Sequence, residues 1–102
     1  MQQDQAEAMR LYHAAADQEY SAAQLHLGTI YATGHGVPQD YAEALRWYRK
    51  AANHDDPAAE YDVGLIYANG LGVPTDLTEA RHWMEKAAAH NEPGAKDWLA
   101  TH

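Results

Sequence analysis

The sequence contains no cysteine and no phenylalanine among its 102 residues, and it has few cationic side chains. Without cysteine, a disulfide framework, thiolate catalysis and cysteine-ligated zinc sites are excluded, whereas cytoplasmic and oxidising compartments both stay open. Seven Lys and Arg against fifteen Asp and Glu give a formal net charge of -8. Because most of such a surface repels a phosphate backbone, we expect no nucleic-acid partner.

Long apolar runs are also missing. No stretch of about 18 apolar residues occurs, so we expect no membrane insertion. The first residues, Met-Gln-Gln-Asp-Gln-Ala-Glu, lack the basic and apolar regions of a signal peptide. The localisation is therefore undetermined, and a cytoplasmic chain and a periplasmic or secreted chain are both compatible with the sequence.

The apolar side chains that are present point to helices. Tyrosine, tryptophan and many alanines supply most of the 46% hydrophobic content, and phenylalanine is absent. Small alanines suit helices that approach closely better than they suit a β-rich core. The length fits one compact domain or a short repeat array, so we predict an all-α protein.

A glycine-rich segment occurs twice. Residues 31–40 read Tyr-Ala-Thr-Gly-His-Gly-Val-Pro-Gln-Asp, and residues 67–76 repeat most of this pattern thirty-six positions later. A histidine between glycines can mark a phosphate or metal site, but His35 has Leu71 as its counterpart, and no P-loop lysine is present. We therefore interpret the segment as a hinge in which glycine permits positive φ and proline stops the helix, with His35 exposed.

An Asp-x-x-Glu signature precedes three segments with helical periodicity, at Asp4 and Glu7, Asp40 and Glu43, and Asp76 and Glu79. It predicts that each aspartate caps a helix and that the glutamate three residues later bonds back to the cap amide. Ser21, the sole serine, also stands at a predicted helix start, so we expect it to cap that helix rather than act as a nucleophile.

The periodicity predicts about six helices, at residues 4–17, 21–33, 40–53, 57–69, 76–90 and 93–101. Each has about three turns and is marginal alone, so the helices must stack as an α-α superhelix, or solenoid. Gly28 and Gly64 stand where paired helices are expected to approach too closely for a side chain. Recurrence at the repeat period assigns Trp47, Trp83, Tyr31 and Tyr67 to the core rather than to an aromatic ligand cage.

No catalytic, cofactor-binding or metal-binding residues emerge from the sequence. The seven histidines include no pair four residues apart that would place two imidazoles on one helix face. Carboxylates outside the caps form no pair that suits acid–base chemistry. We therefore expect a protein that is not an enzyme and holds no cofactor.

The repeated positions are Ala23, Leu27-Gly28, Tyr31, Gly34-x-Gly36-Val37, Asp40, Ala44, Trp47 and Lys50-Ala51-Ala52, followed by a second copy from Ala59 to Ala88. This pattern resembles the Sel-1-like repeat family, helical-hairpin relatives of tetratricopeptide repeats. The resemblance divides the chain into a half repeat 4–20, repeats 21–56 and 57–92, and a partial repeat 93–102. The family commonly has glycine where this sequence has Glu19, Asp55 and Asn91, and Asp and Asn tolerate the left-handed conformation.

The resemblance implies a scaffold for a protein or peptide partner, often in bacteria, with the first helix of each pair lining the concave surface. The positions that differ between repeats on this surface are the candidate partner-binding residues. They are Leu25, His26, Thr29, Thr33, Tyr61, Asp62, Leu65, Asn69 and Trp98, with Asp97 beside them. Leu25 and Tyr61 have an alternative role as packing between repeats. The acidic balance favours a partner segment with Lys or Arg.

Two other functions stay open at this point. The chain can be a fragment of a longer repeat array in an envelope or signalling complex. Cysteine-rich members of the family suggest a β-lactam or cell-wall hydrolase or ligand-binding protein, but their paired cysteines have no counterpart here. The open ends of the array, with Met9 and Leu11 at one end and Trp98 and Leu99 at the other, predict possible head-to-tail self-association.

Overall fold

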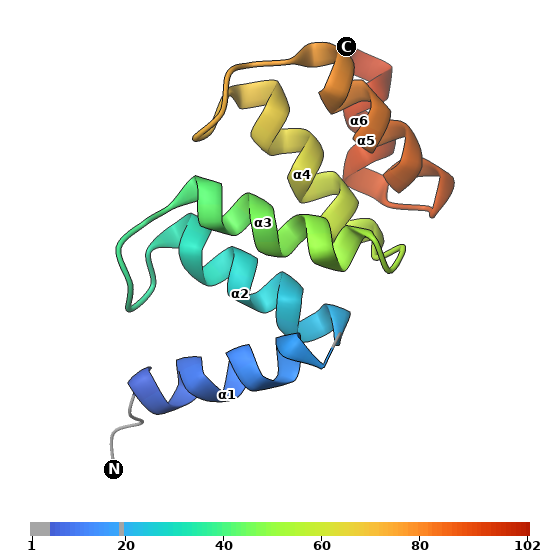
Figure 1. Ribbon diagram of the computed structural model, residues 1–102. Helices are drawn as coiled ribbons and strands as arrows, with labels where there is room; N and C mark the ends of the chain where they lie inside the picture. The colour runs from blue at the N-terminus through green and yellow to red at the C-terminus, as the bar shows by residue number, and fades with distance from the viewer. Residues whose placement is uncertain (1–4, 19) are drawn as a thin grey trace.

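The computed structural model describes residues 5–18 and 20–102, apart from the side chains at positions 5, 6, 8, 12 and 17. It contains six α-helices: α1 Gln5–Asp17, α2 Ser21–Thr33, α3 Tyr41–Ala52, α4 Pro57–Asn69, α5 Leu77–Ala89 and α6 Pro93–Thr101 (Figure 1). These described residues form no β-strand, so the all-α prediction is confirmed. The predicted cap at Asp4, the turn residue Glu19 and the side chain of Ala8 lie outside the description.

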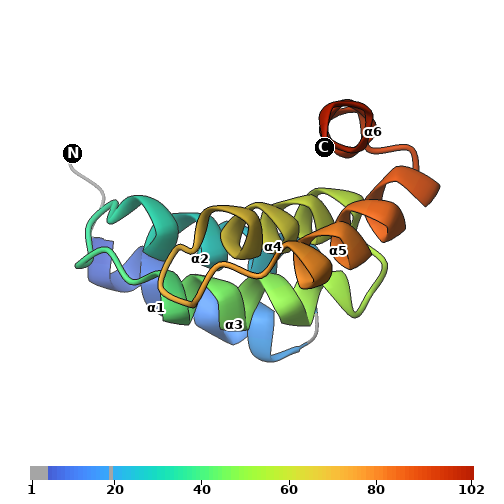
Figure 2. The same ribbon diagram turned by 90° about the horizontal axis from the view of Figure 1, so that it is seen from above.

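Each helix packs against the next one along the chain, which produces an elongated stack of 46 × 24 × 22 Å. Figure 2 shows two layers: α1, α3 and α5 lie toward the lower edge of the picture, and α2, α4 and α6 lie on the other side, toward its upper edge. This arrangement confirms the predicted superhelix of helical hairpins. In the described part of the chain, no helix is long and apolar enough to cross a membrane.

Alanines and two tryptophans are prominent in the core, as the repeat pattern predicts, beside larger aliphatic residues such as Leu27 and Val63. Trp47 and Trp83 are buried; Trp83 belongs to a cluster with fully buried alanines of α3 and α4, and Trp47 belongs to a cluster with Ala16 of α1. Small side chains let helix axes approach closely, and glycines inside helices allow a neighbouring side chain to lie against the backbone. Gly28 lies against the ring of Tyr48, and Gly64 lies against the side chain of Met84.

Residues with a left-handed backbone conformation follow the C-terminal ends of α2, α3, α4 and α5. Gly34 and Gly70 follow α2 and α4 with φ values of 69° and 63°, which confirms the glycine segment as a hinge with His35 exposed. Asp55 and Asn91 have φ values of 62° and 69° in the turns after α3 and α5. These two residues therefore adopt the conformation expected where the family pattern has glycine.

The predicted aspartate caps form, but the reciprocal glutamate bond does not. The Asp76 carboxylate accepts a bond from the Glu79 backbone N–H at 3.0 Å, and Asp40 caps α3 in the same way. The Glu79 side chain instead accepts from Trp83 Nε1 at 3.1 Å. Because the Asp76 N–H already donates to the Tyr67 carbonyl at 2.9 Å, it needs no glutamate partner. The prediction that the glutamate side chain bonds back to the cap amide was therefore wrong.

The predicted cap at Ser21 is also wrong. Ser21 is the first helical residue of α2, and the N-cap position belongs to Tyr20, which makes no side-chain cap bond. In α4 and α6 the cap positions hold Asp56 and Glu92, whose carboxylates accept backbone N–H bonds at 3.0 and 2.9 Å. Ser21 therefore corresponds to Pro57, a residue type that favours the first helical turn.

Removing the α5 cap gives a direct test of its contribution. We expect Asp76→Ala to lower the free energy of unfolding by about 1 kcal/mol, because the Glu79 N–H loses its acceptor. Asp76→Asn keeps an acceptor oxygen and should retain most of the stability. Urea denaturation of both variants measures the difference. Equal stability of Asp76→Ala and the wild type would show that this cap bond contributes nothing.

Candidate functional site

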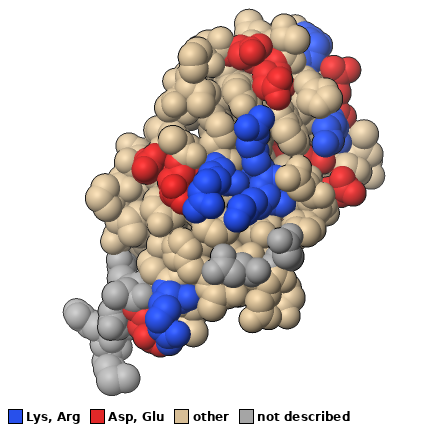
Figure 3. All heavy atoms as spheres, in the orientation of Figure 1, with Lys and Arg blue, Asp and Glu red and all other residues tan. Residues whose placement is uncertain are grey.

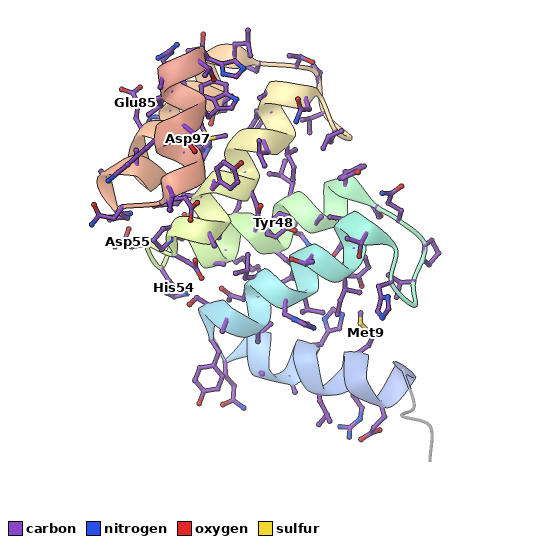
Figure 4. All side chains as sticks on the ribbon, turned by 180° about the vertical axis from the view of Figure 1, so that it is seen from behind. Met9, Tyr48, His54, Asp55, Glu85 and Asp97 are labelled. Atoms are coloured by element: carbon purple, nitrogen blue, oxygen red, sulfur yellow. The ribbon has the colours of Figure 1, made fainter. Side chains whose placement is uncertain are left out.

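The predicted partner-binding residues lie on α2, α4 and α6. These helices share the side of the molecule seen in Figure 4, which we call the α2–α4–α6 face. Exposed on it are His26, Thr29, Thr33, Asn69 and Asp97. The partly buried members are Leu25, Tyr61, Asp62, Leu65 and Trp98.

Three predicted residues come together between the last helices. Tyr61, Leu65 and Trp98 pack against a buried cluster that contains Met84 and Ala87. They are therefore partly used by the fold and offer only their outer edges to a partner.

Tyr61 and Leu25 follow the alternative role that the sequence left open. Tyr61 lies under α6, since a Cβ built on Gly94 would be 2.8 Å from Tyr61 Cζ. Leu25 packs against the core cluster that contains Ala44 and Leu45. Both side chains thus fill space between helices.

The polar residues of α2 are linked by local bonds. Thr33 Oγ1 donates to the Thr29 carbonyl at 2.8 Å, and Thr29 Oγ1 donates to the Leu25 carbonyl at 3.1 Å. Thr33 and Asn69 are the last residues of α2 and α4, and Thr29 lies one turn before the end of α2.

Tyr48 is a central residue of this face that sequence reasoning missed. It belongs to α3, yet its side chain crosses Gly28, and its hydroxyl lies 3.1 Å from Thr29 Oγ1 (Figure 4). Burial raises the pKa of Tyr48, the bond with Thr29 acts in the opposite direction, and the charge of Asp62 raises it further. The only sequence signal was that its counterpart in the next repeat is Met84.

Asp62 supplies the charge at the centre of the face. Burial is the main cause that raises the pKa of its carboxyl group to about 6, and the negative charges of Glu92 and Asp56 add to it. The carboxylate thus lies among like charges while partly withdrawn from water. Such a group gains from a cation that approaches it.

The opposite side of the molecule carries positive charge. Figure 3 shows Lys and Arg atoms gathered over α3, where Arg46, Arg49 and Lys50 border an open groove of about 310 Å³. Arg46 and Lys50 also lie over the ring of Trp47, at 4.5 and 4.7 Å from its centroid. This groove was not predicted from the sequence, and it is the main competitor of the α2–α4–α6 face as a binding surface.

A second missed feature joins α4 to the end of α5. Glu60 is 0% exposed, and its Oε1 lies 2.8 Å from His90 Nδ1. This hydrogen bond and the charge of Glu60 raise the pKa of His90, Asp55 contributes in the same direction, and Lys86 opposes them. The partners are 30 positions apart, and the only hint in the sequence is that Glu60 replaces the Gln24 of the preceding repeat.

Three solved structures that this chain resembles are bacterial proteins. A Sel1 repeat protein from Oxalobacter formigenes is 36% identical with a TM-score of 0.89, over 96% of this chain and 40% of that one. The protein c5321, a protective antigen present in uropathogenic Escherichia coli strains, is 40% identical with a TM-score of 0.87, over 90% and 20% of the two chains. Cysteine-rich protein B of Helicobacter pylori shares the fold, at 23% identity and a TM-score of 0.86 over 94% and 72%.

The first two of these proteins are much longer than the present chain, which spans 40% and 20% of their lengths. A search of functionally curated proteins finds no match. The family model of the Sel1 repeat matches three times, at residues 1–20, 21–56 and 57–92. Proteins with this repeat are generally scaffolds for protein–protein interactions and typically not enzymes. With nearly all of its residues matched, the chain belongs to the Sel1 repeat family.

Proposed function

We propose that the chain is a non-enzymatic scaffold whose α2–α4–α6 face binds a Lys- or Arg-bearing segment of a partner protein. The observation that carries this proposal is the polar centre made by Thr29, Tyr48 and Asp62. The hydrogen-bonded pair of exposed Thr29 and buried Tyr48, together with the partly buried carboxylate of Asp62, lies on helices of two different repeats. Such a centre is rigid, because the packing of both repeats holds it.

The chemistry of the partner follows from the charges around Asp62. The charges that raise its pKa, those of Glu92 and Asp56, are both negative. A Lys or Arg side chain placed here replaces repulsion with attraction in a partly desolvated position, where a charge pair is stronger than in water. The net charge of -8 also favours the approach of a basic segment.

The apolar contribution comes from the edges of packed side chains. Tyr61, Leu65 and Trp98 are partly buried beside the centre, so their exposed edges form one wall without projecting as free anchors. Aromatic side chains held in this way lose little entropy when a partner docks. We therefore propose that the polar centre fixes the position of the partner segment along the face. The three side chains supply the apolar contact area.

The test is a selection from a random peptide library followed by affinity measurements. Peptides that bind the wild-type chain should be enriched in Lys and Arg. In fluorescence anisotropy, Asp62→Asn should weaken their binding about tenfold and reduce its salt dependence. The matched control, Arg49→Ala on α3, should bind as the wild type does.

Two outcomes would contradict the proposal. Selection of acidic peptides whose binding is lost in Arg49→Ala would assign recognition to the groove on α3. Equal binding by Asp62→Asn and the wild type would remove the polar centre from the interface. Circular dichroism of each variant shows that a loss of binding is not a loss of fold.

Head-to-tail pairing of copies stays a prediction and bears on the design of this experiment. Leu11 is 54% exposed near one end of the array, whereas Leu99 at the other end is partly buried. Light scattering of the chain alone, and of Trp98→Ala, comes first. If the measured mass increases with concentration, peptide binding must be measured at concentrations at which the chain is a monomer.

A further inference from the structure

Three potential metal ligands converge where the α3–α4 turn meets the end of α5. Asp55 lies in that turn, Glu60 lies on α4, and His90 follows the last residue of α5. One ligand atom from each of them lies within 4.8 Å of the other two. Figure 4 shows Asp55 at the start of α4, on the side where α5 and α6 meet.

Glu60 is the buried residue of these three, and the described residues leave one of its carboxylate oxygens without a hydrogen bond. Its side chain is fully buried, and Oε1 is 2.8 Å from His90 Nδ1. Its other oxygen, Oε2, is buried without a hydrogen-bond partner among the described residues. A buried carboxylate with one unpartnered oxygen is costly, and more positive charge beside it would lower that cost.

The preceding repeat shows how the same position is filled without charge. Gln24 is also buried, and its Nε2 donates to the Ala16 carbonyl at 3.1 Å. Gln24 Oε1 likewise has no hydrogen-bond partner among the described residues, but an amide oxygen carries no net charge, so its burial costs less. Glu60 therefore introduces a negative charge that the repeat architecture does not need.

We propose that Asp55, Glu60 and His90 bind a divalent first-row transition-metal cation such as Zn²⁺. One imidazole nitrogen and two carboxylates are a ligand set that suits zinc and its neighbours, whereas Mg²⁺ and Ca²⁺ prefer oxygen alone. Three protein ligands leave a further coordination position for water or for a group of a partner. In this arrangement the cation takes the place of the hydrogen bond between Glu60 and His90.

The cation would connect two neighbouring repeats. Asp55 and Glu60 precede α5 in the chain, and His90 closes α5, so a bound ion ties the α3–α4 turn to the following hairpin. A ligand that binds only the folded state raises its apparent stability. Zinc should therefore raise the melting temperature of the wild-type chain.

The variants that test the site are chosen so that the fold persists. Glu60→Gln places at this position the residue that the preceding repeat buries, Gln24. Asp55→Asn places asparagine at a left-handed position. The equivalent left-handed position after α5 already holds an asparagine, Asn91. His82→Gln is the matched control, because His82 is exposed on α5 outside the ligand set.

Isothermal titration of Zn²⁺ into the chain without a histidine tag should show one equivalent bound. Glu60→Gln and Asp55→Asn should weaken this binding by about tenfold or more, and both should lose the zinc-dependent rise in melting temperature. His82→Gln should match the wild type. Mg²⁺ at the same concentration should neither bind nor stabilise.

Three results would overturn the assignment. The first is the absence of heat and of thermal stabilisation when Zn²⁺ is added to the wild type. The second is equal zinc affinity in the wild type, Glu60→Gln and Asp55→Asn, which would show binding by other histidines. The third is equal binding of Mg²⁺, which would exclude a site selective for transition metals.

Discussion

Replacing Gly28 with alanine is expected to lower the free energy of unfolding by about 2–3 kcal/mol, whereas Gly64→Ala should change it by less than about 1 kcal/mol. A Cβ at Gly28 would lie 2.5 and 2.6 Å from the Cδ1 and Cε1 atoms of Tyr48. A Cβ at Gly64 would lie 2.9 Å from Met84 Cε, the end of a flexible side chain. The tyrosine ring cannot move away as easily, because its hydroxyl is bonded to Thr29.

Helix propensity acts against this loss. Alanine is favoured over glycine inside a helix by about 1 kcal/mol, which nearly offsets a small adjustment of Met84 but not the displacement of an aromatic ring. The control is the double variant Gly28→Ala with Tyr48→Met, which reproduces the pairing of Gly64 with Met84. It should recover most of the stability lost in Gly28→Ala. Equal losses at both glycines in denaturant melts would contradict this account of the helix contacts.

The second large effect is expected at Asp62, where Asp62→Asn should stabilise the folded chain at neutral pH by on the order of 2 kcal/mol. Its pKa is about 6 in the fold against an ordinary value of 3.8, mainly because of burial, with contributions from Glu92 and Asp56. The fold therefore favours the protonated carboxyl group. The stability that Asp62 contributes is present at low pH and is lost as the pH rises through about 6.

Denaturation at pH 4 and pH 7 measures this effect as a difference between two proteins. The wild type should lose stability relative to Asp62→Asn between these values, and the contributions of all other groups cancel in the comparison. Asp97→Asn, an exposed change on the same face, should show no such difference. A constant gap between the wild type and Asp62→Asn at both pH values would show that the Asp62 carboxyl group is not perturbed.

A residue that destabilises the free chain at neutral pH is informative about function. Polar and charged groups that strain a fold are commonly found where a protein binds or reacts. Asp62→Asn is expected to raise stability and to weaken peptide binding, and a mutation with these opposite effects separates recognition from folding. This combination is expected if Asp62 lies at the centre of the proposed interface.

The fold could be predicted because its determinants are local and repeated. The glycine hinges, the aspartate caps and the left-handed positions of Asp55 and Asn91 depend on the backbone within a few residues, and each pattern recurs at a fixed spacing. Ser21 was misplaced because cap and first-turn positions differ by a single residue. The capping-box bond failed because a carbonyl in the preceding helix, that of Tyr67, already takes the cap amide of Asp76.

The candidate site was harder to predict because its main contacts join different helices. Tyr48 reaches Thr29 across Gly28, and Glu60 reaches His90 across a whole hairpin. These contacts depend on how helices cross, which helical periodicity alone does not define. A comparison of buried positions between repeats, such as Gln24 with Glu60, was the one signal in the sequence that indicated a departure from the repeat pattern.

The most direct test of the proposed interface is a titration of the isotope-labelled chain with a selected basic peptide, followed by the NMR shifts of its backbone amides. We predict that the largest shifts occur on the α2–α4–α6 face, at Thr29 and around Asp62, and that they diminish in Asp62→Asn. Shifts concentrated instead on α3 at Arg46, Arg49 and Lys50 would contradict the proposed interface and assign recognition to the basic groove on the opposite side.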